Sequence, residues 1–211
     1  MMLYFAPGAC SFIPHVGLEA AGADFEPKLV KLHKGEHRSA EYLAMNPNGQ
    51  VPVLMVDGRP LTQIVAICDF IDRRYPDAGL LPREPWARSQ ALSQLAWMNS
   101  TPHTTATRFF FPERYSETDG GKAEVKRKAT EDYRGYLARM EQMVPRSGLW
   151  FGEKASFHDA YAFTLLRWGG FAGIDYKGFP GYYAYAQRVV QAPPVAAALA
   201  RERIALDTYK G

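Results

Sequence analysis

The sequence predicts an α/β domain at the N-terminus followed by an all-α domain at the C-terminus. In the first third of the 211 residues, short apolar runs with strand character alternate with segments that carry apolar residues at helical spacing. Asp57-Gly58 lies between two of these apolar runs, and it is the strongest short-range hairpin signal in the chain. From Trp86 onward, only helical periodicity is present. The two parts therefore indicate two domains of different class.

The elements of the first domain are expected in the order β-α-β-α-β-β-α. Apolar runs bounded by turn residues mark the strands, and Pro27 gives the second strand an edge position. Thr62 is the expected N-cap of the last helix, because its hydroxyl can accept a hydrogen bond from the first turn. The strands are expected at 2–6, 25–31, 51–56 and 59–61, and the helices at 12–21, 39–45 and 63–74.

The second domain is expected to consist of helices alone. Ser156-Phe-His-Asp159 reads as a capping box, in which the serine and the aspartate each bond the other's backbone at a helix start. Helical periodicity covers 86–110, 121–143, 156–169, 179–191 and 194–203. A cluster of prolines and glycine separates the two parts, so we expect domains at 1–77 and 86–211 and a linker at 78–85.

Composition and charge exclude several classes of protein. The 25 Lys and Arg residues nearly balance the 22 Asp and Glu residues, so we expect no nucleic-acid partner. No apolar stretch approaches the roughly 20 residues of a membrane span, and no secretory signal is recognisable at the start. The two cysteines, Cys10 and Cys68, make no disulfide framework and no metal motif. A reducing cytoplasm is therefore the expected location.

Cys10 lies where the first strand meets the first helix. A helix N-terminus carries unpaired N–H groups and a partial positive charge, which favour a thiolate and lower the pKa of a thiol. Ser11 adds a small hydroxyl at the same point. The alternative is that Cys10 is an inert buried residue, as most free cysteines are, and position alone leaves both readings open. Cys68 lies in mid-helix on an apolar face and is expected in the core.

A second informative segment is Asn46-Pro-Asn-Gly-Gln-Val-Pro-Val-Leu54. A proline between a valine and a strand suits a rigid turn and is compatible with a cis peptide bond before Pro52. Such a turn leaves the N–H and C=O of Val51 free to pair with an extended ligand. The alternative is an ordinary loop that leads into a strand.

Four motifs together resemble a cytosolic glutathione transferase of the bacterial beta class, over essentially the whole chain. They are Pro7-Gly-Ala-Cys10-Ser, the 46–54 segment, the helix from Gln63 to Tyr75, and Ser156-x-x-Asp159 with Leu166-Arg-Trp168. The resemblance implies a thioredoxin-like first domain and an all-helical second domain. It also implies a homodimer, with glutathione as co-substrate and no other cofactor or metal.

The same resemblance assigns roles to individual residues. Cys10 would face the sulfur of glutathione, and the backbone of Val51 would pair with its cysteinyl unit, with Pro52 cis. Lys34 would lie near the glycyl carboxylate. His103 would reach the thiol and hold or move its proton. The alternative for His103 is a polar residue that ends a frayed turn.

The chain departs from the family pattern at the start of the helix after the hairpin. The family usually opens this helix with Glu-Ser or Gln-Ser, which hold the γ-glutamyl end, and some members have Glu-Gly, whereas this chain has Gln63-Ile64. Gln63 offers an amide without charge, and Ile64 offers no hydroxyl. A second departure is Ala96, which falls where beta-class members often carry asparagine.

The chemistry implied is transfer of the glutathione thiolate to small hydrophobic electrophiles. An apolar cleft between the domains would hold the electrophile. Two alternatives remain: a glutathione-dependent thiol–disulfide reductase or peroxidase that forms a Cys10 mixed disulfide, and a non-catalytic dimeric protein that binds a thiol ligand. The candidate wall residues of the cleft are Phe109, Phe110, Phe111, Tyr115 and Trp168.

Overall fold

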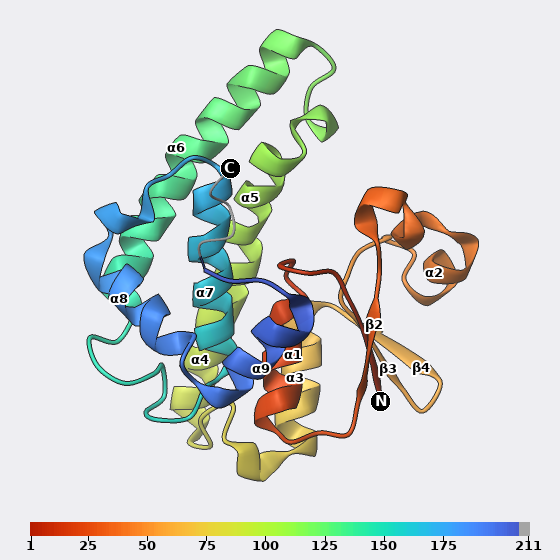
Figure 1. Ribbon diagram of the computed structural model, residues 1–211, viewed down its shortest axis with the longest axis vertical. Coiled ribbons are helices and arrows are strands. Elements are labelled where there is room, and N and C mark those ends of the chain that lie inside the picture. The colour runs from red at the N-terminus through yellow and green to blue at the C-terminus, as the bar shows by residue number, and fades with distance from the viewer. Residues whose placement is uncertain (207–211) are drawn as a thin grey trace.

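The computed structural model describes residues 1–206 and contains a four-stranded mixed sheet beside a stack of helices (Figure 1). The strand order is β2-β1-β3-β4, with β1 parallel to β2 and the other two pairings antiparallel. The predicted element order and the edge position of the second strand are confirmed. The strands are β1 (Met2–Phe5), β2 (Glu26–Leu29), β3 (Val53–Val56) and β4 (Arg59–Thr62).

Successive side chains of a strand point to opposite faces of a sheet, and both faces of this sheet are covered. Leu3, Phe5 and Leu54 belong to the main core, together with α1 and α3, whereas Val53 packs with Tyr42 in a small second core beneath α2. Figure 1 shows α1 and α3 between the sheet and the helical domain, and α2 on the far side. These helices are α1 (Phe12–Ala20), α2 (Ala40–Met45) and α3 (Ile64–Arg74).

Two short 3₁₀ turns, η1 (Leu32–Lys34) and η2 (Glu36–Arg38), lie between β2 and α2. The prediction that Thr62 caps α3 is wrong. Thr62 pairs with Val53 as the last residue of β4, and Gln63 takes the N-cap position instead. Because α3 begins at Ile64, its N-cap is the residue immediately before it, and Thr62 lies one residue too early.

The rest of the described chain is helical, as predicted. The capping box at the start of α7 is confirmed, since Asp159 accepts hydrogen bonds from both the N–H and the hydroxyl of Ser156. The last five residues of the predicted helical domain, 207–211, lie outside the described residues. The longer helices are α4 (Pro85–Ser100), α5 (Pro102–Phe110), α6 (Asp119–Met143), α7 (Phe157–Phe171), α8 (Pro180–Val189) and α9 (Pro193–Glu202).

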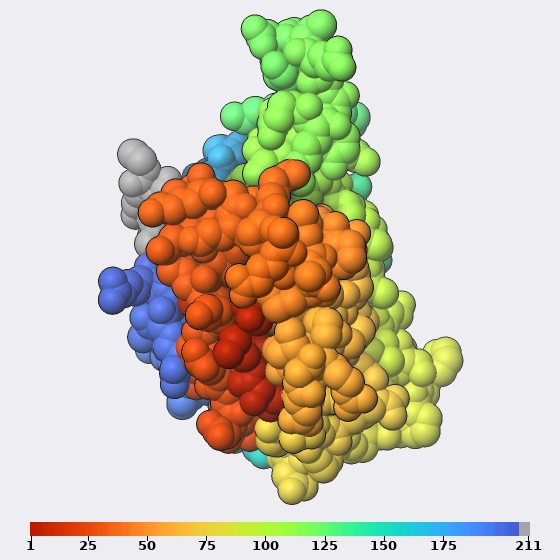
Figure 2. Space-filling model, turned by 90° about the vertical axis from the view of Figure 1, so that its right-hand side faces the viewer, coloured from red at the N-terminus to blue at the C-terminus, as the bar shows by residue number. Residues whose placement is uncertain are grey.

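The single helix predicted over 86–110 is in fact two helices. Thr101 lies between α4 and α5 with φ −114° and ψ −77°, and Pro102 opens α5. Proline has no N–H to donate to the previous turn and its ring crowds that turn, so the helix restarts there. The α5–α6 connection, which contains the turn η4 (Pro112–Arg114), projects beyond the α/β domain in both views (Figures 1 and 2).

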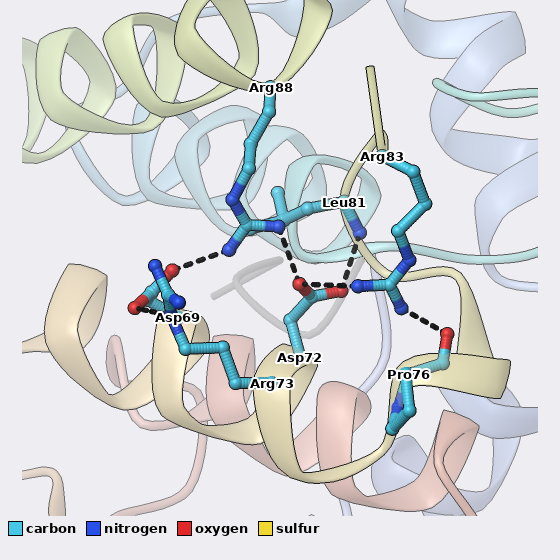
Figure 3. A network of polar contacts seen from close by, with 7 residues as sticks. All are labelled: Asp69, Asp72, Arg73, Pro76, Leu81, Arg83 and Arg88. Atoms are coloured by element: carbon cyan, nitrogen blue, oxygen red, sulfur yellow. Dashed lines mark hydrogen bonds and ion pairs between the residues drawn. The ribbon is translucent and has the colours of Figure 1, made fainter. Parts of the chain in front are cut away.

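The helical domain is fixed to the α/β domain by α7, which packs against α1, and by contacts on two further sides. On one side, α9 returns from the end of the chain to pack beside α1 (Figure 1). On the other side, the buried carboxylate of Asp72 on α3 accepts hydrogen bonds from the N–H of Leu81 and from Arg88 on α4, at 3.1 and 2.6 Å (Figure 3). Arg88 also binds Asp69, so one guanidinium joins two carboxylates of α3. Within residues 1–206, no helix is long and apolar enough to cross a membrane.

Candidate active site

A cleft of about 730 Å³ lies between the two domains. The α/β domain contributes the loops that carry Cys10, Val51 and Gln63, and the helical domain contributes α5 and α7. The remaining lining residues are Pro7, Gly8, Ala9, Leu32, His33, His37, Asn46, Gly49, Gln50, Pro52, Ile64, Asn99, His103, Thr104, Ala106, Thr107, Phe110, Phe111, Arg114, Arg167, Trp168 and Phe171.

Cys10 lines this cleft, partly buried, two residues before α1 begins. Its Sγ lies 3.3 Å from the carbonyl oxygen of Val51, to which the thiol donates a hydrogen bond. Burial raises the pKa of Cys10 to about 12, and the charge of Glu202 adds to this, while backbone hydrogen bonds oppose it. Of the two readings that the sequence leaves open, the raised pKa favours the buried thiol, because burial and a nearby carboxylate outweigh the helix N-terminus.

Ser11 does not face the cleft. It is fully buried, and its hydroxyl donates to the carbonyl of Ala6 and accepts from the N–H of the same residue, at 3.2 and 3.1 Å. Its hydroxyl therefore closes the turn between β1 and α1 rather than supplying a second nucleophile.

Gly8 anchors the loop that carries Cys10 to the helical domain. Its N–H donates to the carboxylate of Glu202 on α9 at 2.8 Å, and its carbonyl accepts from the indole N–H of Trp168 at 3.0 Å. Gly8 has φ +68°, and a Cβ there would lie 2.4 Å from the guanidinium of Arg167, so only glycine fits. Sequence reasoning noted Arg167 and Trp168 in a motif, but nothing in the sequence signalled Glu202.

The cis peptide bond before Pro52 is confirmed, whereas the carbonyl of Val51, which the sequence predicts to be free, accepts a hydrogen bond within the protein. The carbonyl of Gln50 accepts hydrogen bonds from Tyr42 and Asn46, at 2.8 and 2.7 Å. These two bonds hold the loop against the short helix α2. The carbonyl of Val51 is the one that meets the thiol of Cys10.

Gln63 and Ile64 both line the cleft at the start of α3. Gln63 has φ +72° and ψ 119°, a conformation that costs a non-glycine residue on the order of 1–3 kcal/mol and is found mainly at functional sites. Ile64 is 5% exposed and packs in the main core. The N-terminus of α3 therefore faces the cleft between Gln63, whose backbone is strained, and the apolar side chain of Ile64.

His103 is the second residue of α5, so it starts a helix rather than ending a frayed turn. Its Nδ1 lies 2.7 Å from the hydroxyl oxygen of buried Tyr161, whose O–H donates to Asn99 at 3.1 Å. Because the tyrosine proton is used toward Asn99, Nδ1 is the donor to Tyr161, and Nε2 keeps its lone pair. Burial lowers the pKa of His103 to about 4, so its ring is neutral near pH 7.

The chain carries an asparagine, Asn99, one helical turn after Ala96, the position where an asparagine is common in the beta class. Ala96 is exposed and does not line the cleft, whereas Asn99 does. Asn99 lies on α4 and His103 on α5, so the break at Thr101, and not a spacing along one helix, sets how these two residues meet.

Three other predicted site residues do not line the cleft. Lys34 is exposed on η1, and its neighbours Leu32, His33 and His37 line the cleft instead. Phe109 points into the helical core, where its ring packs edge-on against Tyr133 at 5.1 Å. Tyr115 is exposed directly after η4, where its hydroxyl bonds Thr107 at 2.8 Å. The other predicted wall residues, Phe110, Phe111 and Trp168, line the cleft.

Among residues 1–206, no group of three or more His, Cys, Asp and Glu side chains is arranged to hold a metal ion. A model of the glutathione S-transferase N-terminal domain matches residues 1–73. The chain is also 32% identical over 208 residues to glutathione S-transferase GstA of Escherichia coli O157:H7, covering 96% of this chain and 98% of that protein. The chain belongs to the glutathione S-transferase family.

Solved structures of the glutathione S-transferase family agree with the fold described above. A sphingomonad glutathione S-transferase complexed with glutathione is 34% identical, with a TM-score of 0.83 over 97% of this chain and 100% of that one. The beta class glutathione S-transferase of Sphingomonas chungbukensis is 33% identical, with a TM-score of 0.82 over 96% and 98% of the two chains. The sheet, the six longer helices and the cleft between them thus follow the family pattern.

Proposed function

We propose that this protein catalyses transfer of the glutathione thiolate to small electrophiles bound in the interdomain cleft. The observation that carries this proposal is the meeting of the Cys10 thiol with the backbone of Val51 at a cleft whose other wall is aromatic. The complex of the sphingomonad relative with glutathione supports the same ligand. Glutathione is the co-substrate, and no further cofactor enters the proposal.

Glutathione would lie extended along the α/β side of the cleft. Its cysteinyl unit would pair with the main chain of Val51, as an added strand does at a sheet edge. Its γ-glutamyl carboxylate would approach the free N–H groups at the N-terminus of α3, beside Gln63 and Ile64. Its glycyl end would extend toward His33 on η1, close to the predicted Lys34.

In the reaction, the sulfur of glutathione attacks an electrophilic carbon, a C–S bond forms, and a leaving group departs with its electron pair. The thiol proton leaves to solvent, and Nε2 of neutral His103 is the hydrogen-bond acceptor that the cleft offers on its way, because a ring with a pKa of about 4 does not keep the proton. The raised pKa of Cys10 keeps it a thiol near pH 7. Cys10 would therefore turn its one S–H from the carbonyl of Val51 to the glutathione thiolate, and it would not itself attack.

The test is conjugation of 1-chloro-2,4-dinitrobenzene with glutathione, together with retention on a glutathione matrix. We expect retention and conjugation by the wild-type chain. Cys10→Ser should keep measurable activity, because a hydroxyl still donates a hydrogen bond, and Cys10→Ala should lose more. Retention without conjugation of any electrophile would favour the non-catalytic binding protein.

The reductase alternative requires a different intermediate. The Cys10 thiolate would attack the glutathionyl sulfur of a mixed disulfide between glutathione and a substrate thiol, form a Cys10–glutathione disulfide and release the substrate thiol. A glutathione thiolate would then attack that disulfide, release Cys10 and leave as oxidised glutathione. Mass spectrometry after treatment with oxidised glutathione tests this step. A tripeptide adduct on Cys10, with thiol exchange faster than conjugation, would replace the transferase proposal.

Three further attributes belong to the proposal. The Cys10 motif and the Sphingomonas chungbukensis relative support assignment to the beta class. A homodimer is expected from the resemblance, and light scattering in solution would give twice the chain mass if that is correct. Both cysteines are free, which suits a reducing cytoplasm.

A further inference from the structure

The charged side chains that line the cleft all carry positive charge. Among the described residues that line it, none is aspartate or glutamate, while Arg114 and Arg167 are cationic. Arg167 is committed to the fold, because its side chain donates to the carbonyls of Ala205 and Gly8. The other guanidinium of the cleft, that of Arg114, is therefore the candidate for binding a ligand.

Arg114 lies on η4, at the open end of the cleft. Its guanidinium carbon is 4.1 Å from the centre of the Phe111 ring, and the side chain is exposed. Within residues 1–206, no carboxylate forms an ion pair with it. Across the opening stands His37, whose pKa is lowered by burial and by the positive charges of Arg38 and Arg114. The positive charges of Arg38 and Arg114 therefore both act at this opening.

A row of aromatic rings runs from the thiol site to Arg114. The ring of His103 lies 4.9 Å from Trp168, Trp168 lies 5.8 Å from Phe110, and Phe110 lies 6.2 Å from Phe111. We call Trp168, Phe110 and Phe111 the aromatic shelf. Phe110 and Phe111 are 36% and 38% exposed, so a planar ligand can reach their rings.

We propose that the preferred electrophile is a planar aromatic molecule that bears an anionic group, such as a carboxylate. Its ring would lie on the aromatic shelf, and its anion would bind Arg114. A guanidinium held flat on a ring presents its N–H edge outward, which suits two parallel hydrogen bonds to a carboxylate. This inference rests on the proposed transferase function and specifies its second substrate.

The anions of glutathione do not account for Arg114. In the proposed placement, the γ-glutamyl carboxylate uses the N-terminus of α3, and the glycyl end extends toward η1 on the same domain. Arg114 belongs to η4 on the helical domain, and its charge also acts on His37 near η1, so the test below measures the KM for glutathione as well. The anionic group of the electrophile would take no part in the reaction, because the bond that forms is C–S and the bond that breaks joins the reacting carbon to the leaving group.

The test compares two electrophiles that differ only in charge, 4-chloro-3-nitrobenzoate and 4-chloro-3-nitrobenzamide. Each enzymatic kcat/KM is divided by the uncatalysed rate constant with glutathione, which removes the difference in intrinsic reactivity. We expect the wild-type chain to prefer the benzoate by about tenfold, as for one charged hydrogen-bonded contact in a partly exposed site. Chloride leaves in both reactions, and the carboxylate is unchanged.

Arg114→Gln should remove most of this preference and change the KM for glutathione less than twofold. Arg108→Gln is the matched control, because Arg108 is also stacked on an aromatic ring, that of Tyr115 at 5.9 Å, but does not line the cleft. Arg108→Gln should keep the preference. Both arginines are exposed, so circular dichroism should show both variants folded.

The possible results distinguish failure of the anionic-substrate proposal from failure of the proposed transferase function. Equal corrected rates for benzoate and benzamide in the wild-type chain would overturn the anionic substrate and leave the transferase function intact. A higher KM for glutathione in Arg114→Gln, with the preference unchanged, would assign Arg114 to glutathione and also overturn it. Failure to conjugate either compound or 1-chloro-2,4-dinitrobenzene would remove the transferase function itself.

Discussion

The carboxylate of Glu202, near the end of the chain, accepts a 2.8 Å hydrogen bond from the N–H of Gly8, two residues before Cys10. Its other oxygen accepts from Nδ1 of His15 at 2.8 Å, and both side chains are buried. The last helix of the chain therefore holds the loop and the helix that flank the thiol. The position of Cys10 in the cleft depends on a contact between residues 194 positions apart.

Glu202→Gln should weaken both folding and catalysis. An amide cannot accept from Gly8 and His15 at once, because its NH₂ group would face one of the two donors. A buried polar group left unpaired costs about 1–3 kcal/mol of unfolding free energy, and a displaced loop should lower kcat about tenfold or more. Arg201→Gln, at an exposed position of the same helix, is the control and should change neither the unfolding free energy nor kcat by much. Denaturant unfolding and conjugation kinetics measure the two effects, and wild-type values for Glu202→Gln would refute the anchoring role.

Cys10 should react as a high-pKa thiol when no ligand is bound. Burial raises its pKa to about 12, so the thiolate fraction near pH 7 is very small. The rate of alkylation by iodoacetamide should increase about tenfold per pH unit up to at least pH 10. Cys68 is fully buried and should not react in the folded protein, which mass spectrometry of the alkylated peptides can verify. A rate that levels off near pH 7 would show instead that the helix N-terminus controls the thiol.

Tyr161 and His103 should act as one unit. The hydroxyl of Tyr161 receives the Nδ1 proton of His103 and so fixes the tautomer with Nε2 free. We expect His103→Gln to lower kcat about 10²-fold or more, and Tyr161→Phe about tenfold with a similar KM for glutathione. The double variant should be no slower than His103→Gln alone, because the tyrosine acts through the histidine. Additive losses would mean that Tyr161 has a separate, structural role.

The predictions that succeeded rest on local chemistry. The hairpin at Asp57-Gly58, the edge strand with Pro27 and the capping box at Ser156 each follow from residues within four positions of one another. The cis bond before Pro52 and the all-helical second half were also predicted correctly.

The predictions that failed, and the choice left open at Cys10, depend on context that local patterns do not carry. Periodicity continues across Thr101, so the break between α4 and α5 was hidden, and with it the register that brings Asn99 to the cleft. The pKa of Cys10 depends on Glu202, far along the chain, and on how deeply the thiol lies. Arg114 carries no motif, and only the folded cleft identifies it as the guanidinium beside the aromatic shelf.

Acid should destabilise the protein through two buried histidines. Burial lowers the pKa of both His158 and His103 to about 4, compared with about 6.5 when unfolded. Between pH 6.5 and pH 4 the unfolded chain therefore binds more protons, so the unfolding free energy falls as the pH falls through this window. The slope is at most about 1.4 kcal/mol per pH unit for each histidine.

His158 offers the cleaner test of this acid effect. Its Nε2 bonds the carbonyl of Ala91 at 3.0 Å, and its buried Nδ1 has no partner among the described residues. His158→Gln can still donate to Ala91 but cannot titrate, so its unfolding free energy should fall less steeply between pH 6.5 and 4. His33→Gln, at an exposed position, should keep the wild-type slope. Equal slopes in all three proteins would show that His158 does not titrate in this range.

Ile64→Ser should bind glutathione more tightly and fold less stably. A hydroxyl at the first position of α3 adds a donor for the γ-glutamyl carboxylate, which is worth about 10- to 100-fold in affinity when the acceptor is charged. Ile64 is 5% exposed in the main core, so its loss should cost about 2–5 kcal/mol of unfolding free energy. Val65→Ser is the matched control, because Val65 packs against the same core but does not line the cleft. It should lower stability and leave the affinity for glutathione, measured by calorimetry, unchanged. Equal affinities in Ile64→Ser and the wild-type chain would mean that the γ-glutamyl end of glutathione lies elsewhere.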